Sequence, residues 1–170
     1  MTRHIALLRA VNVGGRTVKK ADLIPAFEQM GFSGVWTFLA SGNVVFDAPA
    51  PPSPDAIAAG LEAALGFPIP TFLRTPDELF AVVDRDPFDG AGTRYVAFGH
   101  APLDPGVVAR LDAKGSAVDR FVARGRELHW QITGGFSDSA FQGPTLERLA
   151  GVPLTARKDT TLARIAKKLR

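Results

Sequence analysis

The sequence predicts an α+β fold built from two tandem ferredoxin-like halves, with mainly antiparallel sheets and helices packed on them. Three observations favour this class. Apolar alternation and capping signals give the element order β-α-β-β-α-β in residues 1–85. The same order returns in residues 93–170, and each half ends in a further helix. The two halves share little side-chain identity, so the predicted repeat depends on element order alone.

Apolar periodicity and capping residues delimit the elements of the first half. The run at residues 4–11 is apolar on both faces and predicts a strand covered on both sides. Ser53 before Pro54 is an N-cap followed by a first-turn proline, and Thr75 with Glu78 forms a capping box. The expected strands are residues 4–11, 35–40, 43–47 and 69–74, and the expected helices are residues 21–30, 54–65 and 76 up to the linker.

The segment 84–93 is predicted to be a linker because Asp, Gly and Pro interrupt every apolar period there. Beyond it, alternating apolar residues and capping signals give the second half. Its expected strands are residues 95–100, 120–123, 128–133 and 153–157, and its expected helices begin at Asp104-Pro105 and cover residues 145–150 and 160–169.

Composition excludes several classes of protein. Of the 170 residues, 46% are hydrophobic and 22% charged, as in an ordinary globular domain. No apolar run approaches the roughly 20 residues that cross a bilayer, so no membrane partner is expected. The N-terminus lacks a secretory signal pattern, which predicts a cytoplasmic protein. The chain contains no cysteine, which excludes disulfides, thiolate zinc sites and cysteine nucleophiles.

The C-terminal segment is the most basic part of the chain. Residues 157–170 hold six basic side chains and one acid, Asp159, although the whole chain carries a net charge of only +3. Such a segment could contact nucleic acid or another anionic surface. The alternative is a terminal helix whose cations complement its own dipole. The second account is favoured because no aromatic residues interleave with the charges.

Glycines and small polar residues follow the first strand and recur in the first hairpin. In the predicted topology the third strand lies antiparallel between the first and the second, so these two segments meet at one edge of the sheet. Glycines let a ligand approach backbone N–H groups, and arginine donates hydrogen bonds to phosphate or carboxylate in a planar fork. The sequence therefore predicts an anion-binding rim, with Arg157 as a further contributor, formed by Arg9, Asn12, Gly14, Gly15, Ser41 and Asn43.

Ordinary turn chemistry is the alternative account of the rim residues. Gly14-Gly15 would then only permit a tight strand-to-helix turn, Ser41 and Asn43 would belong to a hairpin, and Arg9 would pair with a carboxylate. No GxGxxG or GxxxxGK[ST] motif is present, so neither a Rossmann nor a P-loop site is predicted.

Catalytic and metal-binding patterns are absent from the sequence. His4, His100 and His129 have no histidine partner at i,i+4, and no GxSxG nucleophile motif occurs. The sequence assigns no catalytic residue, no metal ligand and no cofactor. It does not decide whether the protein is an enzyme, nor which oligomer it forms.

A second polar surface is predicted on the sheet of the C-terminal half. Strand 128–133 alternates, so that Leu128, Trp130 and Ile132 face the core. Its polar residues would share an open sheet face with those of the last strand: His129, Gln131, Thr155 and Arg157. Simple exposure to solvent accounts for such a face. The rival hypothesis is a nucleic-acid-binding module that uses this face and the basic C-terminal helix.

Three stretches of the chain resemble the family called domain of unknown function 1697. Residues 6–15, ALLRAVNVGG, are similar to its "LLRGINVGG" start, and residues 37–46, TFLASGNVVF, to its "T-x-x-x-SGNVVF" block. Thr155-Ala156-Arg157 with Thr161 is similar to its "T-x-R-N-W-N-T" stretch, although Lys158-Asp159-Thr160 replaces Asn-Trp-Asn. The resemblance implies an uncharacterised bacterial protein with a duplicated α+β fold, and it carries no activity with it.

The sequence thus favours an uncharacterised cytoplasmic protein that binds a small anionic ligand, a nucleotide or a phosphate ester, at the predicted rim. Nucleic-acid binding is the alternative.

Overall fold

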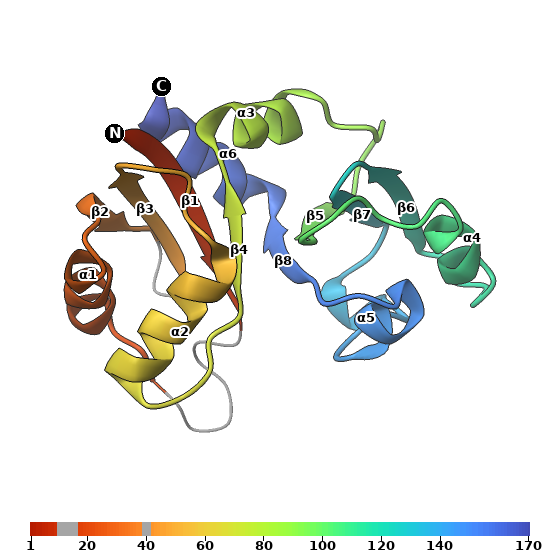
Figure 1. Cartoon of the computed structure of the whole chain (residues 1–170). Coiled ribbons are helices and arrows are strands. Elements are labelled where there is room, and N and C mark those ends of the chain that lie inside the picture. The colour runs from red at the N-terminus through yellow and green to blue at the C-terminus, as the bar shows by residue number, and fades with distance from the viewer. Residues whose placement is uncertain (10–16, 39–41) are drawn as a thin grey trace. The chain divides into compact units, whose positions relative to one another are not determined.

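The structure of the protein is a computed structural model, and it describes residues 1–9, 17–38 and 42–170. Expectations for residues 10–16 and 39–41, which include the ends of two predicted strands, lie outside this part of the chain. The remainder divides into two compact units, Met1–Leu79 and Phe80–Arg170 (Figure 1). The division falls inside helix α3, shortly before the linker expected from the sequence.

The first unit contains four strands and two helices, and α3 follows them. Its elements are β1 (Thr2–Leu8), α1 (Lys20–Gln29), β2 (Ser33–Thr37), β3 (Asn43–Ala48), α2 (Pro54–Leu65), β4 (Thr71–Arg74) and α3 (Pro76–Asp84). The strands form one sheet in the order β2-β3-β1-β4, and every neighbouring pair is antiparallel. This places β1 in the interior of the sheet, as the sequence predicts.

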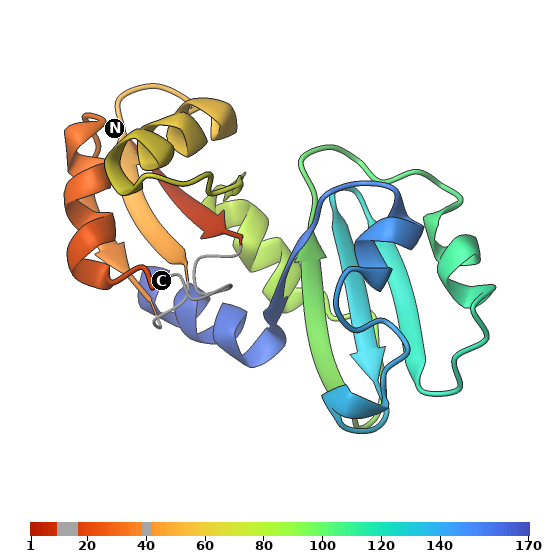
Figure 2. The ribbon, with the colours of Figure 1, turned by 90° about the horizontal axis from the view of Figure 1, so that it is seen from below.

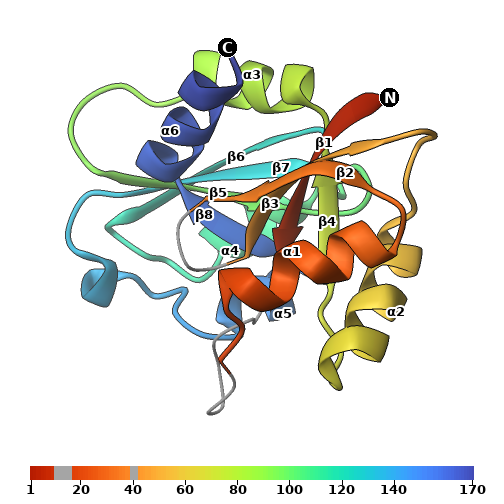
Figure 3. The ribbon, with the colours of Figure 1, turned by 90° about the vertical axis from the view of Figure 1, so that its left-hand side faces the viewer.

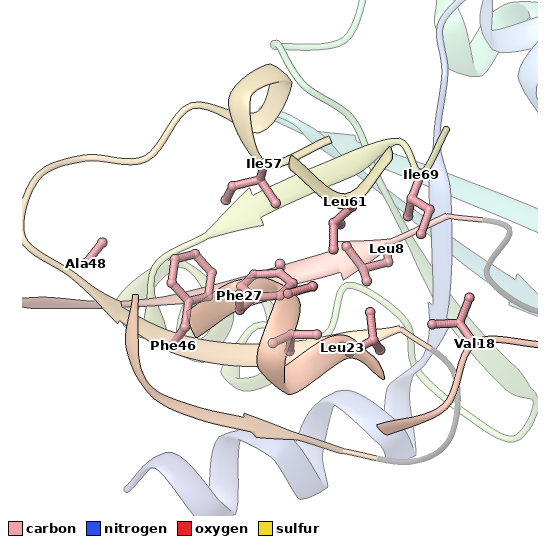
Figure 4. Close-up of a cluster of buried hydrophobic side chains, with 12 residues drawn as sticks. Leu8, Val18, Leu23, Phe27, Phe46, Ala48, Ile57, Leu61 and Ile69 are labelled. Carbon is pink, nitrogen blue, oxygen red and sulfur yellow. The ribbon is translucent and has the colours of Figure 1, made fainter. Parts of the chain in front are cut away.

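Helices α1 and α2 pack on one face of this sheet (Figure 3). Phe27 of α1 and Phe46 of β3 are fully buried, with ring centroids 5.1 Å apart (Figure 4). The opposite face of β1 is covered too, because Ile5 and Leu7 are each only 1% exposed. A strand that is apolar on both faces is therefore buried on both faces, as its sequence predicts.

The second unit repeats this arrangement. Its elements are β5 (Thr93–Phe98), α4 (Val107–Asp112), β6 (Asp119–Arg124), β7 (Glu127–Ile132), a short 3₁₀ helix η1 (Phe136–Asp138), α5 (Thr145–Ala150), β8 (Thr155–Lys158) and α6 (Asp159–Leu169). The strand order β6-β7-β5-β8 and its antiparallel pairing match the first sheet. Helices α4 and α5 cover one face and share a core with Trp130 (Figure 2).

The predicted fold class is confirmed: the protein is α+β, with two similar halves consistent with a tandem duplication. The caps of α2 and α3 are those predicted, since Ser53 Oγ accepts a hydrogen bond from Ala56 N and Thr75 pairs reciprocally with Glu78. Helix α4 begins later than predicted, because the Asp104 carboxylate accepts a hydrogen bond from Gly106 N at 2.6 Å and closes a turn before the helix. The sequence did not predict η1.

Gly34→Ala is expected to destabilise the first unit by about 2 kcal/mol. Gly34 has φ +58°, where a Cβ costs about 1 kcal/mol, and that Cβ would lie 2.6 Å from Asp47 Oδ2. Asp47 accepts two hydrogen bonds of 2.9 Å from Arg3, so the collision would also disturb this ion pair. Urea denaturation measures the loss of stability.

Gly31→Ala provides the matched control. Gly31 has φ +86°, but a Cβ added there would meet nothing within 4 Å, so only the backbone cost of about 1 kcal/mol remains. Equal losses in the two variants would show that contact with Asp47 contributes nothing.

Candidate functional site: the edge of the first sheet

The end of β1 and the turn before β3 lie at the same edge of the first sheet. Leu8 N donates a hydrogen bond of 2.7 Å to Gly42 O, and Leu7 is the register partner of Asn43. The next residue, Arg9, donates its N–H to Pro70 O at 2.9 Å. Segments more than thirty residues apart in sequence are therefore neighbours here. This is the juxtaposition that the sequence predicts for the rim.

The structure brings Arg9 and Asn43 to this edge, in different environments. Arg9 is partly exposed. Asn43 is 1% exposed, and its Nδ2 donates a hydrogen bond of 3.0 Å to Phe38 O. Since Phe38 N in turn donates to Asn43 O at 3.0 Å, Asn43 closes the connection between β2 and β3. Of the two, Arg9 is the side chain with access to solvent.

Two lysines stand at the start of helix α1. Val18, just before α1, is buried in the same core cluster as Leu8, so the chain returns to the end of β1 before the helix starts (Figure 4). Lys19 and Lys20 follow and are exposed. The N-terminus of a helix also carries partial positive charge.

Four predicted rim residues, Asn12, Gly14, Gly15 and Ser41, lie outside the described part of the chain. Arg157 belongs to the second unit, on β8. Its Nη1 donates hydrogen bonds to Thr155 Oγ1 at 2.8 Å and to Ala156 O at 2.9 Å. Burial of the guanidinium lowers the pKa of Arg157 to about 10, which leaves it charged at neutral pH.

The polar face predicted on the second sheet is not open, and this expectation is wrong. His129, Gln131 and Thr155 lie there but are at most 5% exposed. Helix α6 packs against β5 and β8 on that side, and its own residues Leu162 and Ile165 are buried. The alternation in β7 correctly separates the two faces, but it does not reveal that both are covered.

The linker between α3 and β5 covers another part of the same face. Arg94 on β5 binds it with three contacts, an ion pair with Asp86 and hydrogen bonds to Phe88 O at 3.1 Å and Gly90 O at 2.7 Å. The Arg120 guanidinium lies 5.7 Å from the centre of the Phe88 ring. Arg94 of β5 and Arg120 of β6 thus hold the linker against the sheet, although the sequence predicts only a connection there.

Within residues 1–9, 17–38 and 42–170, no helix has the length and apolar character required to cross a membrane. The same residues contain no group of three or more histidine, aspartate or glutamate side chains placed to hold a metal ion.

Comparison with known families and structures adds the relationships of the chain. A family model described as "Protein of unknown function (DUF1697)" matches residues 1–129. The chain belongs to this family. The resemblance inferred from its first two motifs is therefore confirmed, and the Thr155-Ala156-Arg157 motif lies beyond the matched residues.

One solved structure, described as that of "conserved bacterial protein SP0830 from Streptococcus pneumoniae", is similar over 99% of both chains. Its TM-score is 0.66 and its sequence identity to this DUF1697 member is 22%, so the likeness concerns the fold alone. No curated protein matches the chain.

Sequence reasoning missed the contacts that cover the His129 face of the second sheet. The signal was present in the pattern of arginines, since Arg94, Arg120 and Arg124 all lie on the His129 face of the sheet. Arg124 Nη1 donates a hydrogen bond of 2.6 Å to Arg85 O, which adds to the attachment of the linker. Arg157 of β8 lies on the same face, and arginines gathered on one sheet face indicate that a chain segment or a ligand must satisfy them.

Proposed function

We propose that this protein binds a small anionic ligand, such as a nucleotide or a phosphate ester, at the edge of the first sheet where β1 ends. The hydrogen bond from Leu8 N to Gly42 O carries the proposal, because it joins the two segments that the sequence marks as glycine-rich and polar. Asn12, Gly14, Gly15 and Ser41 enter the proposal from the sequence alone. We propose further that the protein acts in the cytoplasm, as its sequence predicts.

Charge supports an anion rather than a cation at this edge. Arg9, Lys19 and Lys20 are contributed by two neighbouring segments, and Asp22 is the nearest acid in the sequence. The carboxylate of Asp22 is already engaged, since it accepts a hydrogen bond of 3.1 Å from Lys19 N. Arg9 would supply a charge-assisted hydrogen bond to the ligand, and Asn43 would hold the hairpin beside it.

Arg9→Ala is expected to weaken anion binding about tenfold or more, because a hydrogen bond to a charged group contributes about 1.5–3 kcal/mol. A thermal-shift screen against sulfate, nucleotides and sugar phosphates identifies a ligand, and titration calorimetry measures the dissociation constants of the wild-type protein and the variant.

Arg3→Ala is the matched control, because Arg3 lies at the other end of β1 and pairs with Asp47 at 2.9 Å. It should change anion affinity by less than twofold. The proposal fails if no anion stabilises the wild-type protein, or if Arg9→Ala binds as tightly as wild type.

A further inference from the structure

The second unit contains a cavity of about 170 Å³ on the face of its sheet that carries His129. All residues that line it come from Val82 to Ala163, and most of its wall is apolar. The apolar contributors come from the end of α3, the linker, β5 and α6: Val82, Val83, Phe88, Val96, Leu162 and Ala163. A mainly apolar hollow with a few polar groups is the usual character of a small-molecule site.

His129 is the imidazole among the residues that line this cavity. His129 lines the cavity and is 5% exposed. Burial, assisted by the positive charge of Arg124, lowers the pKa of His129 to about 4, although Asp86 opposes this change. The ring is therefore neutral at pH 7 and offers one donor and one acceptor. A ligand in the cavity can form a hydrogen bond with this ring.

The charged side chains that line the cavity do not favour an anion. Asp86 and Asp159 contribute carboxylates to the lining, whereas Arg94 contributes the one guanidinium among the described lining residues. Asp86 also pairs with Arg94, and the buried Nε of Arg94 makes no hydrogen bond to any described residue. An uncharged molecule that can exchange a hydrogen bond fits these walls better than an ion does.

We propose that this cavity binds an uncharged molecule of one aromatic ring, with a hydroxyl or ring-nitrogen edge directed at His129. The volume suits one ring, since a protein cavity of about 150 Å³ accommodates benzene. The apolar walls would cover the faces of the ring, and His129 would fix its orientation. This site is separate from the proposed anion site and takes a different chemical class of ligand.

Phenol and benzene are suitable probes, because they differ only in the hydroxyl group. Each is titrated into the full-length ¹⁵N-labelled protein, and amide chemical shifts report both the dissociation constant and the place of binding. Phenol should shift the amides of Val96, His129 and Leu162 and bind more tightly than benzene. In His129→Phe, which keeps a ring but loses both nitrogens, phenol affinity should fall about five- to tenfold, as expected for one hydrogen bond. Benzene affinity should change less than twofold.

Ala163→Phe tests the cavity without altering His129. Ala163 is an exposed residue of α6 that lines the cavity, so a larger side chain can occupy the space while the helix is retained. This variant should lose binding of both probes, whereas Lys167→Phe, an exposed change on the same helix outside the lining, should bind both normally.

Three results would overturn the inference: phenol shifts no cavity resonance, Ala163→Phe binds phenol as wild type does, or His129→Phe weakens both probes equally. None of these results bears on the Arg9→Ala titration, so the two sites fail or succeed independently.

Discussion

Asp119→Asn is expected to destabilise the second unit by about 3 kcal/mol. The Asp119 carboxylate is 7% exposed and accepts four hydrogen bonds, which come from Ser116 Oγ at 2.6 Å, Ser139 Oγ at 2.6 Å, Trp130 Nε1 at 2.7 Å and Ala140 N at 3.0 Å. An asparagine amide has one acceptor oxygen, so its NH₂ group would face two donors. Each lost hydrogen bond to a buried charge costs about 1.5 kcal/mol or more.

Trp130 is itself the probe for this experiment. Its indole donates to Asp119, so its fluorescence follows the unfolding of the second unit directly. Urea denaturation is measured in a Trp36→Phe background, since Trp36 is the other tryptophan and belongs to the first unit. Asp112→Asn, an exposed change on α4, should alter stability by less than about 0.5 kcal/mol. A similarly small effect of Asp119→Asn would mean that the four hydrogen bonds are not essential.

The pH dependence of stability gives an independent test of Asp119. Burial tends to raise its pKa, but the hydrogen bonds from Ser116, Ser139, Ala140 and Trp130 outweigh burial and lower it. A pKa that is lower in the folded state than in the unfolded state stabilises the fold above the unfolded value of about 4. That contribution is lost as the pH falls through the folded value. The variant should therefore lose less stability than wild type between pH 4 and pH 2.

Local sequence patterns were sufficient to predict the α-helices and strands of the described residues and their order. Strand β7 alternates, α2 has its cap at Ser53, and α3 has the Thr75–Glu78 capping box, so each signal lies within a few residues. The meeting of the two segments followed from topology, because the predicted strand order brings Leu8 beside Gly42, whereas the rim itself stays a prediction. These inferences needed no knowledge of contacts between distant side chains.

The sequence did not reveal that the linker and α6 cover the His129 face of the second sheet. An alternating strand has the same pattern whether its polar face meets water or a segment that satisfies its hydrogen bonds. Here Arg94 and Arg124 hold the linker, and α6 covers β5 and β8, through pairings that no local periodicity records. Of the polar residues predicted for this face, His129 lines a cavity, whereas Gln131 and Thr155 are buried, so the face offers no surface for stacking bases. The nucleic-acid hypothesis loses its sheet face and retains only the basic side of α6.

Phe46→Ala is expected to destabilise the first unit by about 3–5 kcal/mol, the usual cost of removing a buried phenylalanine. Phe46 is fully buried on β3, and its ring centroid lies 5.1 Å from that of Phe27 (Figure 4). The ring centroid of Phe32 lies 4.6 Å from that of Phe46. Hydrogen exchange of the β1 and β3 amides measures the loss, and the amides of β5 and β7 in the second unit serve as an internal reference. Phe46→Leu, which keeps most of the volume, should cost about 1.5 kcal/mol or less.

The same substitution connects the core to the proposed anion site. Leu8 belongs to the core cluster that contains Phe46, and Arg9 follows it directly in the chain. Loosening this cluster should therefore weaken the hydrogen bond from Leu8 to Gly42 and raise the exchange rate of the Leu8 amide. If Phe46→Ala instead leaves Leu8 exchange unchanged, the edge of the sheet is held by its loops and not by the core. Anion affinity would then be expected to survive the substitution.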